Sequence, residues 1–413
     1  METIIRAALK RKPPSSEPVI RRIHDFSSDD EELKRVLTNL KTDIKIVGCG
    51  GAGNNTIQRC METGLTDVEL ISVNTDAQHL LSRQAHKKVL IGRKLTRGLG
   101  AGSVPEIGER AAMESKEELS AVIANADIVF LTCGLGGGTG TGSIPVLAQL
   151  SKEQNSLTIA IVTYPFRAEG TPRMLNADKG LEKLRKYSDT VIIIPNDKLL
   201  EIVPNLPLSR AFEVADEILM RAIQGITEMI TKPSLINLDY ADLRTVMKDG
   251  GVAMIGIGEG NSSENKALEA VNEALKSPLL DVDISNAKGA LINVAGGPKM
   301  TMSEAEMVLE EVHGRISPTA EIIWGARIDE SLGDAIRVML VVTGVSSQQI
   351  LGPTTGKKTK KSRLEKFGID VVKGEEKEEY PGRISFARTV GVEDSNNDEE
   401  SEYEAKKEGE KDE

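Results

Sequence analysis

Glycine and threonine are concentrated between Gly134 and Ser143, where the sequence reads GLGGGTGTGS. The run follows an apolar segment at 126–133 and precedes a helical pattern at 144–152. Glycines let a backbone turn sharply and approach phosphate oxygens, and the free N–H groups at a helix N-terminus bind anions. Thr139 and Thr141 add hydroxyl groups without adding charge. We therefore predict that this run binds the phosphate chain of a nucleotide.

A second glycine-rich run, Gly48–Asn55, also lies between a predicted strand and a predicted helix. Its glycines fit the pattern G-x-G-x-x-G, which is typical of dinucleotide-binding domains but weak on its own. Asp76 follows at about the distance of roughly 20 residues expected for a ribose-binding carboxylate. An NAD-dependent oxidoreductase is therefore the alternative interpretation, and a plain tight turn is the less favoured one.

The two runs together favour a nucleoside triphosphate over a dinucleotide. A dinucleotide domain uses one glycine turn of this kind, whereas two turns on one sheet would grip several phosphates. Gly134–Ser143 lacks the Gly-Lys-Ser/Thr ending of a P-loop. Without a lysine in the run, we expect backbone dipoles and Mg²⁺ to balance the phosphate charge. A third stretch, Gly98–Ser103, could supply donors to a terminal phosphate.

The elements that must position these loops follow an alternating pattern. Short β-branched runs alternate with segments of helical periodicity from Asp43 onward, which predicts an α/β fold with a parallel sheet covered by helices. Ligands of such sheets bind at the carboxyl ends of the strands. A long amphipathic helix follows Pro207 and ends before Pro233. The predicted strands lie at 44–47, 68–73, 128–132, 157–163 and 190–194, and, in a smaller second unit, at 252–256, 290–294, 322–326 and 337–342.

Composition restricts the class of protein. The 413 residues carry a net charge of -11, and 15 acidic against 6 basic residues lie in the last forty positions. The rest of the chain is nearly neutral, which argues against a nucleic-acid partner. No run approaches the roughly 18 apolar residues of a membrane span. Three cysteines without a CxxC pair fit a reducing cytoplasm.

The run GGGTGTGS at 136–143 resembles the signature of the tubulin/FtsZ family of GTPases. The resemblance extends from about Asp43 to Val345. Tyr164 departs from it, because the family pattern TRPF has arginine at that position, and the tail lacks a clear docking peptide. Other matching segments are Gly48–Asn55, Asn74-Thr-Asp, Gly98–Ser103, and those at 163–166, 194–197 and 237–242.

The resemblance implies a tubulin-like architecture. It comprises a Rossmann-like GTP-binding domain at 43–206, a central connector helix at 207–232, and a catalytic loop with a smaller α/β C-terminal domain at 233–345. An N-terminal extension at 1–42 and a charged tail at 346–413 lie outside the match. The tail is expected to be disordered, and its apolar islands at 367–372 and 384–386 are candidate docking peptides.

The resemblance also implies roles for individual residues. Phe212 and Asp216, four apart on one helix face, would hold the guanine, and the carboxylate would select guanine over adenine. Glu169 and Arg173 would contact the ribose. Residues assigned to the phosphates are Gly51, Ala52, Gly53, Asn54, Asn55, Gly138, Thr139 and Gly140, with Ala101 and Gly102 near the γ-phosphate and Asn74 and Asp76 in the same nucleotide site.

Hydrolysis of GTP needs a positioned water, and the glycine loops supply no obvious group to orient it. Asp239 and Asp242 form the best carboxylate pair and share a face if helical. A connector of about 24 residues spans about 36 Å, so its far end cannot return to the same nucleotide. The pair would then act on the nucleotide of a different subunit, as the resemblance implies for subunits stacked head to tail. The alternative is that both aspartates cap a helix.

We therefore expect a GTPase that binds GTP and GDP and polymerises into the filaments of a cytoplasmic, mid-cell division ring. Its partners would be further copies of itself and division or membrane-tethering proteins that bind the tail. A non-catalytic assembly scaffold is the third interpretation, and the presence of Asp239 and Asp242 argues against it.

Overall fold

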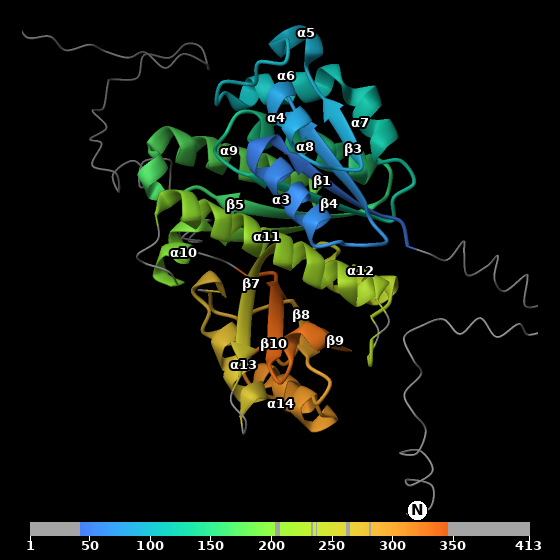
Figure 1. Cartoon of the computed structure of the whole chain (residues 1–413), viewed down its shortest axis with the longest axis vertical. Helices are drawn as coiled ribbons and strands as arrows, with labels where there is room; N and C mark the ends of the chain where they lie inside the picture. The colour runs from blue at the N-terminus through green and yellow to red at the C-terminus, as the bar shows by residue number, and fades with distance from the viewer. Residues whose placement is uncertain are drawn as a thin grey trace, which may run out of the picture. The chain divides into compact units, whose positions relative to one another are not determined.

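A computed structural model describes residues 42–202, 207–232, 234–236, 238–261, 265–280 and 282–345 (Figure 1). Its ten strands form one sheet in the order β3-β2-β1-β4-β5-β6-β7-β10-β8-β9. The strands are β1 Ile44–Cys49, β2 Glu69–Asn74, β3 Lys87–Leu90, β4 Ile128–Gly134, β5 Leu157–Tyr164, β6 Thr190–Pro195, β7 Gly251–Gly260, β8 Gly289–Gly296, β9 Glu321–Ile328 and β10 Ile336–Thr343.

The first six strands are all parallel to their neighbours in the sheet. Except in the edge strand β3, their side chains are buried on both faces, as in β4, where Ile128 and Phe130 enter one core and Val129 and Leu131 enter the other. This double burial explains why the strands are continuous apolar runs instead of alternating patterns. The predicted parallel α/β fold is therefore confirmed.

Helices cover both faces of the sheet. One core contains residues of α6–α9, α13 and α14, and the other contains residues of α3 and α10–α12. The helices are α3 Gly50–Glu62, α4 Ala77–Ser82, α5 Arg93–Thr96, α6 Pro105–Glu114, α7 Lys116–Val122, α8 Thr139–Glu153, α9 Thr171–Tyr187, α10 Asn196–Ile202, α11 Leu208–Thr231, α12 Tyr240–Met247, α13 Lys266–Leu275 and α14 Met302–His313, with 3₁₀ turns η1 Arg167–Glu169, η2 Pro278–Leu280 and η3 Glu330–Leu332.

The C-terminal strands form a mixed extension of the same sheet. β7 pairs with β6 in parallel over Thr190–Ile192, β10 is antiparallel to both β7 and β8, and β9 is parallel to β8. The predicted strands of the smaller unit all lie within these elements, and β7 continues beyond its predicted end to Gly260.

The long helix α11 has 24 residues, as predicted. Leu219, Ile223 and Ile226 are buried along its apolar stripe. The helix contacts α3 and β5, which precede it in the chain, and β8, which follows it (Figure 1). It therefore connects the N-terminal and C-terminal portions of the chain.

Two elements differ from the prediction. The edge strand β3 was not predicted, because its sequence KKVL is short and half charged. Helix α8 begins at Thr139 instead of Ile144, so residues of the glycine–threonine run form its first turn. Residues 1–41 of the N-terminal extension and the tail islands lie outside the described residues.

The three cysteines, Cys49, Cys60 and Cys133, are buried and free. Burial raises the pKa of Cys49 and Cys60 to about 12, so these thiols stay protonated at neutral pH. In the part of the chain that the structure describes, no helix has the length and apolar character needed to cross a bilayer.

Candidate functional site

The two main glycine-rich loops lie side by side at the carboxyl ends of adjacent strands. β1 and β4 pair in parallel with Gly48 opposite Thr132. Helix α3 then begins at Gly50 and α8 at Thr139, and neither N-terminus is capped by a side chain. The first N–H groups of both helices are therefore free to bind an anion at one edge of the sheet.

The glycines of these loops allow backbones to approach more closely than any side chain would permit. A Cβ on Gly50 would lie 2.8 Å from the amide nitrogen of Gly140, and a Cβ on Gly138 would lie 2.9 Å from the Cβ of Ala101. The runs 48–55, 98–103 and 134–143 therefore converge on one place. Replacement of Gly50 or Gly138 would force these segments apart.

Side chains from neighbouring segments hold the loops in register. The Thr75 and Thr139 hydroxyl oxygens lie 2.6 Å apart. The amide N–H of Gly136 donates to Thr141 Oγ1 at 2.9 Å, and Asn176 Nδ2 donates to the carbonyl of Ser103 at 3.1 Å. The segment 74–76 and helix α9 are thus fixed to the same site.

Asn54 and Asn74 form the buried centre of this arrangement. In the amide orientation that satisfies its neighbours, Asn54 Nδ2 donates to the carbonyls of Gly48 and Gly50, and Asn54 Oδ1 accepts from Asn74 Nδ2 at 3.0 Å. Asn74 Oδ1 accepts from the amide N–H of Thr75 at 2.9 Å. Both side chains shape the loops from inside, and their direct contact with a nucleotide stays a prediction.

The predicted guanine-binding pair lies near the start of α11. Phe212 is 38% exposed, so it is not simply a core residue. Its ring meets Phe166 edge to face, with centroids 5.3 Å apart. Asp216 accepts a hydrogen bond from Asn55, which ties it to the first loop. An open ring and a partly buried carboxylate on one helix face suit a purine base.

Burial raises the pKa of Asp216 to about 6, against the opposing effects of Arg59 and the Asn55 hydrogen bond. Because the pKa is higher than in the unfolded chain, this group favours folding at low pH, and that contribution is lost as pH rises through about 6.

We therefore expect the stability of the wild type, relative to the Asp216→Asn variant, to fall by about 2 kcal/mol between pH 4.5 and pH 7. Urea unfolding without nucleotide, repeated across this pH range, measures the difference. A constant difference between the two proteins would show that Asp216 titrates as an ordinary carboxyl group.

Glu169 and Arg173, the predicted ribose contacts, are bonded to each other. Arg173 Nη1 lies 2.5 Å from Glu169 Oε2, and Glu169 Oε1 accepts from the amide N–H of Phe166 at 3.0 Å. Phe166 in turn contacts Phe212, so the ribose and base residues belong to one cluster. Tyr164, the departure from the family pattern, donates to Asp178 Oδ1 at 2.8 Å.

Asp239 and Asp242 lie near the amino ends of the parallel strands, opposite the carboxyl ends where the glycine loops lie. The adjacent Tyr240 hydroxyl is 3.4 Å from the carbonyl of Asp127, which precedes β4, whereas the glycine–threonine run follows β4. The 7 residues of β4 separate the two ends of the strand by about 20 Å. The aspartates therefore cannot reach the loops of their own subunit.

Asp239 and Asp242 also cap α12. Asp239 Oδ1 accepts from the amide N–H of Asp242 at 2.8 Å, and Asp242 Oδ2 accepts from the amide N–H of Asp239 at 3.3 Å. This reciprocal pair is a capping box, so both aspartates do cap a helix. Both side chains remain exposed, which leaves the second carboxylate oxygen of each available for a catalytic role.

One side chain beside the first loop was not singled out from the sequence. His79 lies in α4, and a Cβ on Gly51 would be 4.0 Å from its Nε2. The available signal was its spacing, because His79 follows Asp76 by one helical turn.

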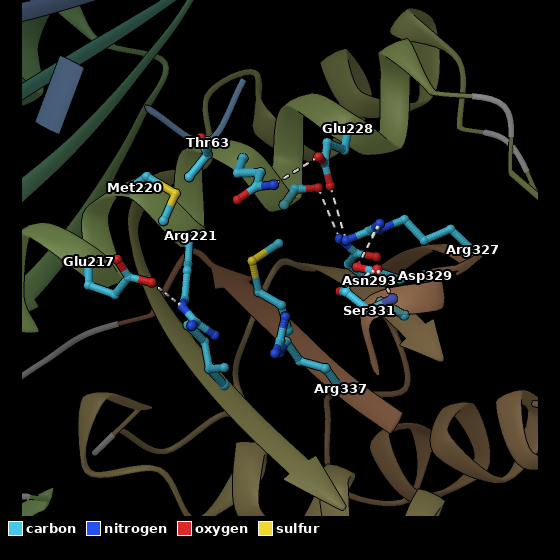
Figure 2. Close-up of a pocket in the computed structure, with 15 residues that line it drawn as sticks. Thr63, Glu217, Met220, Arg221, Glu228, Asn293, Arg327, Asp329, Ser331 and Arg337 are labelled. Carbon is cyan, nitrogen blue, oxygen red and sulfur yellow. Dashed lines mark hydrogen bonds and ion pairs between the residues drawn. The ribbon is translucent and has the colours of Figure 1, made fainter. Parts of the chain in front are cut away.

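A cavity of about 230 Å³ lies between α11 and the strands β7–β10 (Figure 2). Its polar lining includes Glu217, Arg221, Glu228, Asn293, Arg327 and Arg337. Each of these three arginines has a carboxylate partner. The charges that line the cavity are therefore balanced, and, among the described residues, the cavity lacks the uncapped helix N-termini found at the glycine loops.

Glu228 is the buried member of this network, with 1% of its surface exposed. Its Oε1 lies 2.6 Å from Lys232 Nζ and accepts from Gln224 Nε2 at 2.9 Å. Its Oε2 lies 3.0 Å from Arg327 Nη2 on β9, as Figure 2 shows. The pair joins the connector helix to the C-terminal strands.

Arg327→Met is expected to destabilise the protein by about 3 kcal/mol, because it leaves one oxygen of a buried carboxylate without its cation. Arg337→Met is the matched control. Arg337 pairs with the more exposed Glu259, so its loss should cost at most about 1 kcal/mol. Urea unfolding compares the two variants, and equal losses would contradict a structural role for the Glu228–Arg327 pair.

Comparison with known proteins places this geometry in a family. The family model described as "Tubulin/FtsZ family, GTPase domain" matches residues 43–204, and "FtsZ family, C-terminal domain" matches residues 251–346. The Cell division protein FtsZ 1 of Archaeoglobus fulgidus is 55% identical over 373 residues, which are 90% of this chain and 100% of that protein. The FtsZ 1 of Thermococcus kodakarensis is 55% identical over 84% of this chain and 92% of its own length.

Solved structures agree with these matches. An FtsZ dimer without ligand from M. jannaschii superposes with a TM-score of 0.74 and 56% identity, and it covers 77% of this chain and 93% of its own. The more distant CetZ2 of Haloferax volcanii, at 21% identity, a TM-score of 0.67, and coverage of 79% of this chain and 100% of its own, shows the shared fold alone. The chain therefore belongs to the tubulin/FtsZ family of GTPases, within its FtsZ branch.

Proposed function

We propose that this chain hydrolyses GTP in a site that two subunits complete, with the glycine loops of one and Asp239 and Asp242 of the next. The chain is a GTPase of a filament-forming, cell-division family. The proposal rests on the separation of these two groups of residues. The phosphate loops lie at the carboxyl ends of the parallel strands, and the aspartates lie near the amino ends. No single subunit can bring them together.

Head-to-tail stacking follows from this separation. A contact between two different surfaces of the same chain does not close on itself, so repetition produces a filament. The dimeric FtsZ structure from M. jannaschii supports association between copies of this chain. Light scattering with GTP and with GDP, alongside phosphate release, would test whether assembly and turnover occur together.

The chemistry divides between the two surfaces. The helix N-termini of α3 and α8 hold the phosphates, while the carboxylates of Asp239 and Asp242 orient the attacking water and accept its proton. The described residues contain no group of three or more His, Cys, Asp or Glu side chains that could hold a metal. Mg²⁺ would therefore be bound largely by phosphate oxygens and water, where it would offset the charge of the phosphoryl group.

Guanine nucleotide is the substrate best supported by the base-binding residues. Asp216 can accept hydrogen bonds from the guanine N1–H and 2-amino groups, and an adenine would offer the wrong pattern. Family membership and this carboxylate together argue against the NAD-dependent alternative. Tight NAD binding with no GTP binding would overturn this part of the proposal.

Two exposed apolar side chains mark the surfaces that would meet. Leu99 is 85% exposed and forms an isolated antiparallel backbone bridge with Asp76, beside the proposed nucleotide site. Leu235 is 64% exposed beyond the end of α11, where its amide N–H donates to the carbonyl of Ala326 at 2.9 Å. Burial of such side chains on assembly is worth about 1.5–3 kcal/mol each.

Leu235→Lys is expected to raise the critical concentration for assembly by at least about tenfold, because it removes one apolar contact and buries a charge. GDP binding should stay unchanged, since Leu235 lies away from the loops. Met113→Lys, at another exposed apolar position on α6, is the matched control and should assemble like the wild type. Normal sedimentation of Leu235→Lys filaments would exclude this surface from the contact.

The cellular setting is also part of the proposal. Relatives named as cell division proteins support action at a division ring. We propose a cytoplasmic position at mid-cell, with division or membrane-tethering proteins bound to the acidic tail. Deletion of residues 346–413 would then leave GTP turnover intact and disperse the ring.

A further inference from the structure

Among the described residues, His79 is a titratable side chain that lies against the first phosphate loop and that the proposed mechanism leaves unused. The residue is partly buried, and its Nδ1 lies 3.4 Å from Nδ2 of Asn74 at the end of β2. A Cβ on Gly51 would lie 4.0 Å from His79 Nε2. Gly51 belongs to the first turn of α3, where the free N–H groups lie. The imidazole therefore borders the predicted phosphate site.

The hydrogen-bond network fixes which ring nitrogen faces the loop. Asn74 Nδ2 lies 3.4 Å from His79 Nδ1. The same amide donates to Asn54 Oδ1, so its nitrogen is assigned as a donor. Because Asn74 donates to Nδ1, the neutral ring carries its proton on Nε2. The Nε2–H group is thus the one directed toward the loop that contains Gly51.

The charged groups around His79 come from its own helix. Burial and the nearby Arg83 hold the pKa of His79 below its ordinary value, and Asp76 opposes them. The neighbouring elements present neutral groups to the ring, which are Gly51 from α3 and Asn74 from β2. The empty site thus favours the neutral imidazole, and an added anion would change this balance.

We propose that His79 is a further nucleotide-binding residue, which donates its Nε2–H to a phosphate oxygen of the bound guanine nucleotide. It binds more strongly as imidazolium, whose charge on the phosphate outweighs loss of the long 3.4 Å contact between Asn74 Nδ2 and Nδ1, since Nδ1 then carries a proton. The inference rests on the proposed placement of the phosphates at the glycine loops. It gives this site a side-chain cation that the loops themselves lack. Nucleotide binding and proton uptake are then coupled, so each favours the other.

The sign of the coupling separates His79 from other groups that titrate nearby. Protonation of His79 strengthens phosphate binding as pH falls. Protonation of Asp216 weakens guanine binding over the same range, and protonation of the terminal phosphate lowers its charge. Both opposing effects are shared by the wild type and a His79→Gln variant. Their ratio of affinities therefore isolates the contribution of His79.

The experiment measures GDP dissociation constants of the full chain from pH 8 to pH 5.5, at protein concentrations that prevent assembly. His79→Gln keeps a neutral donor of similar reach, and His313→Gln, at an exposed position of α14, is the control. We expect the affinity ratio of wild type to His79→Gln to rise about tenfold on acidification, the equivalent of one pKa unit. The ratio of wild type to His313→Gln should stay constant.

A second readout needs no folded variant. The chain has 4 histidines, so NMR can follow each imidazole while GDP is added. The pKa of His79 should rise on binding, and the His313 signal provides the internal reference.

Parallel affinity curves, or a His79 pKa that GDP leaves unchanged, would overturn the inference while the proposed GTPase site stands. Absence of GDP binding by the wild type at every pH would overturn the proposed site as well.

Discussion

Asp239→Asn is expected to lower GTP turnover by roughly 10²–10⁴-fold while GTP binding and assembly persist, because it removes a positioned carboxylate that would act on the attacking water. Asparagine is chosen because it caps helices as well as aspartate does. The amide can still accept the hydrogen bond from Asp242. A loss of turnover therefore reports chemistry and not a frayed α12.

The controls separate charge from position. Asp242→Gln retains the reciprocal bond of the capping box and should also lose turnover. Asp249→Asn removes an equal charge just beyond α12, where the backbone is left-handed with φ 54°, a conformation that asparagine tolerates. It should hydrolyse GTP normally. Wild-type turnover by Asp239→Asn and Asp242→Gln under assembling conditions would show that the capping role is their whole role.

Asp216→Asn is expected to weaken GDP binding by about a hundredfold, which corresponds to about 3 kcal/mol. The variant loses charge-assisted hydrogen bonds to the guanine N1–H and 2-amino groups, each worth about 1.5–3 kcal/mol. Its new amide N–H₂ faces the 2-amino group, where two donors oppose each other. Isothermal titration with GDP provides the measurement.

Xanthosine diphosphate makes this test sharper. Xanthine carries a carbonyl oxygen where guanine carries the 2-amino group, so an asparagine can donate to it while accepting from N1–H. Asp216→Asn should therefore prefer xanthosine diphosphate to GDP, and the wild type should show the reverse preference. Glu213→Gln, an exposed position on the same helix, should retain the wild-type preference. An unchanged preference in Asp216→Asn would place the base elsewhere.

Much of the fold was readable from the sequence because its elements are strongly patterned. The buried parallel strands are continuous apolar runs, and the stripe of α11 repeats over 24 residues. Strand β3 was missed because two of its four residues are lysines and its pairing with β2 depends on the neighbouring strand. Local pattern cannot show a strand that only its partner stabilises.

The candidate site was predictable from the sequence where it depends on glycine spacing, and it was not predictable where it depends on long-range contacts. Glycine spacing alone predicts phosphate-binding loops at 48–55 and 134–143. The close approach of Gly50 to Gly140 exists only in the folded chain. The same holds for the raised pKa of Asp216, which comes from burial. It holds also for His79, whose direction is set by Asn74 and Asn54 across three segments.

The proposed dual role of Asp239 and Asp242 rests on the same distinction between local pattern and long-range position. Their spacing predicts a capping box as readily as a catalytic pair, and the structure shows the capping bonds. Their distance from the loops comes from the position of Tyr240 beside Asp127. That distance turns two ordinary helix-capping residues into candidates for catalysis in a neighbouring subunit.

Mixing two inactive variants tests the shared site most directly. Asp239→Asn keeps its nucleotide loops but lacks a working carboxylate, whereas Asp216→Ala keeps Asp239 but binds GTP poorly. Phosphate release would be measured for each alone and for the mixture, at a GTP concentration that saturates only Asp239→Asn. We expect turnover in the mixture well above the sum of the two, because Asp239 of one variant completes the nucleotide site of the other. Turnover equal to that sum, in a mixture shown to co-assemble, would contradict a site completed between subunits.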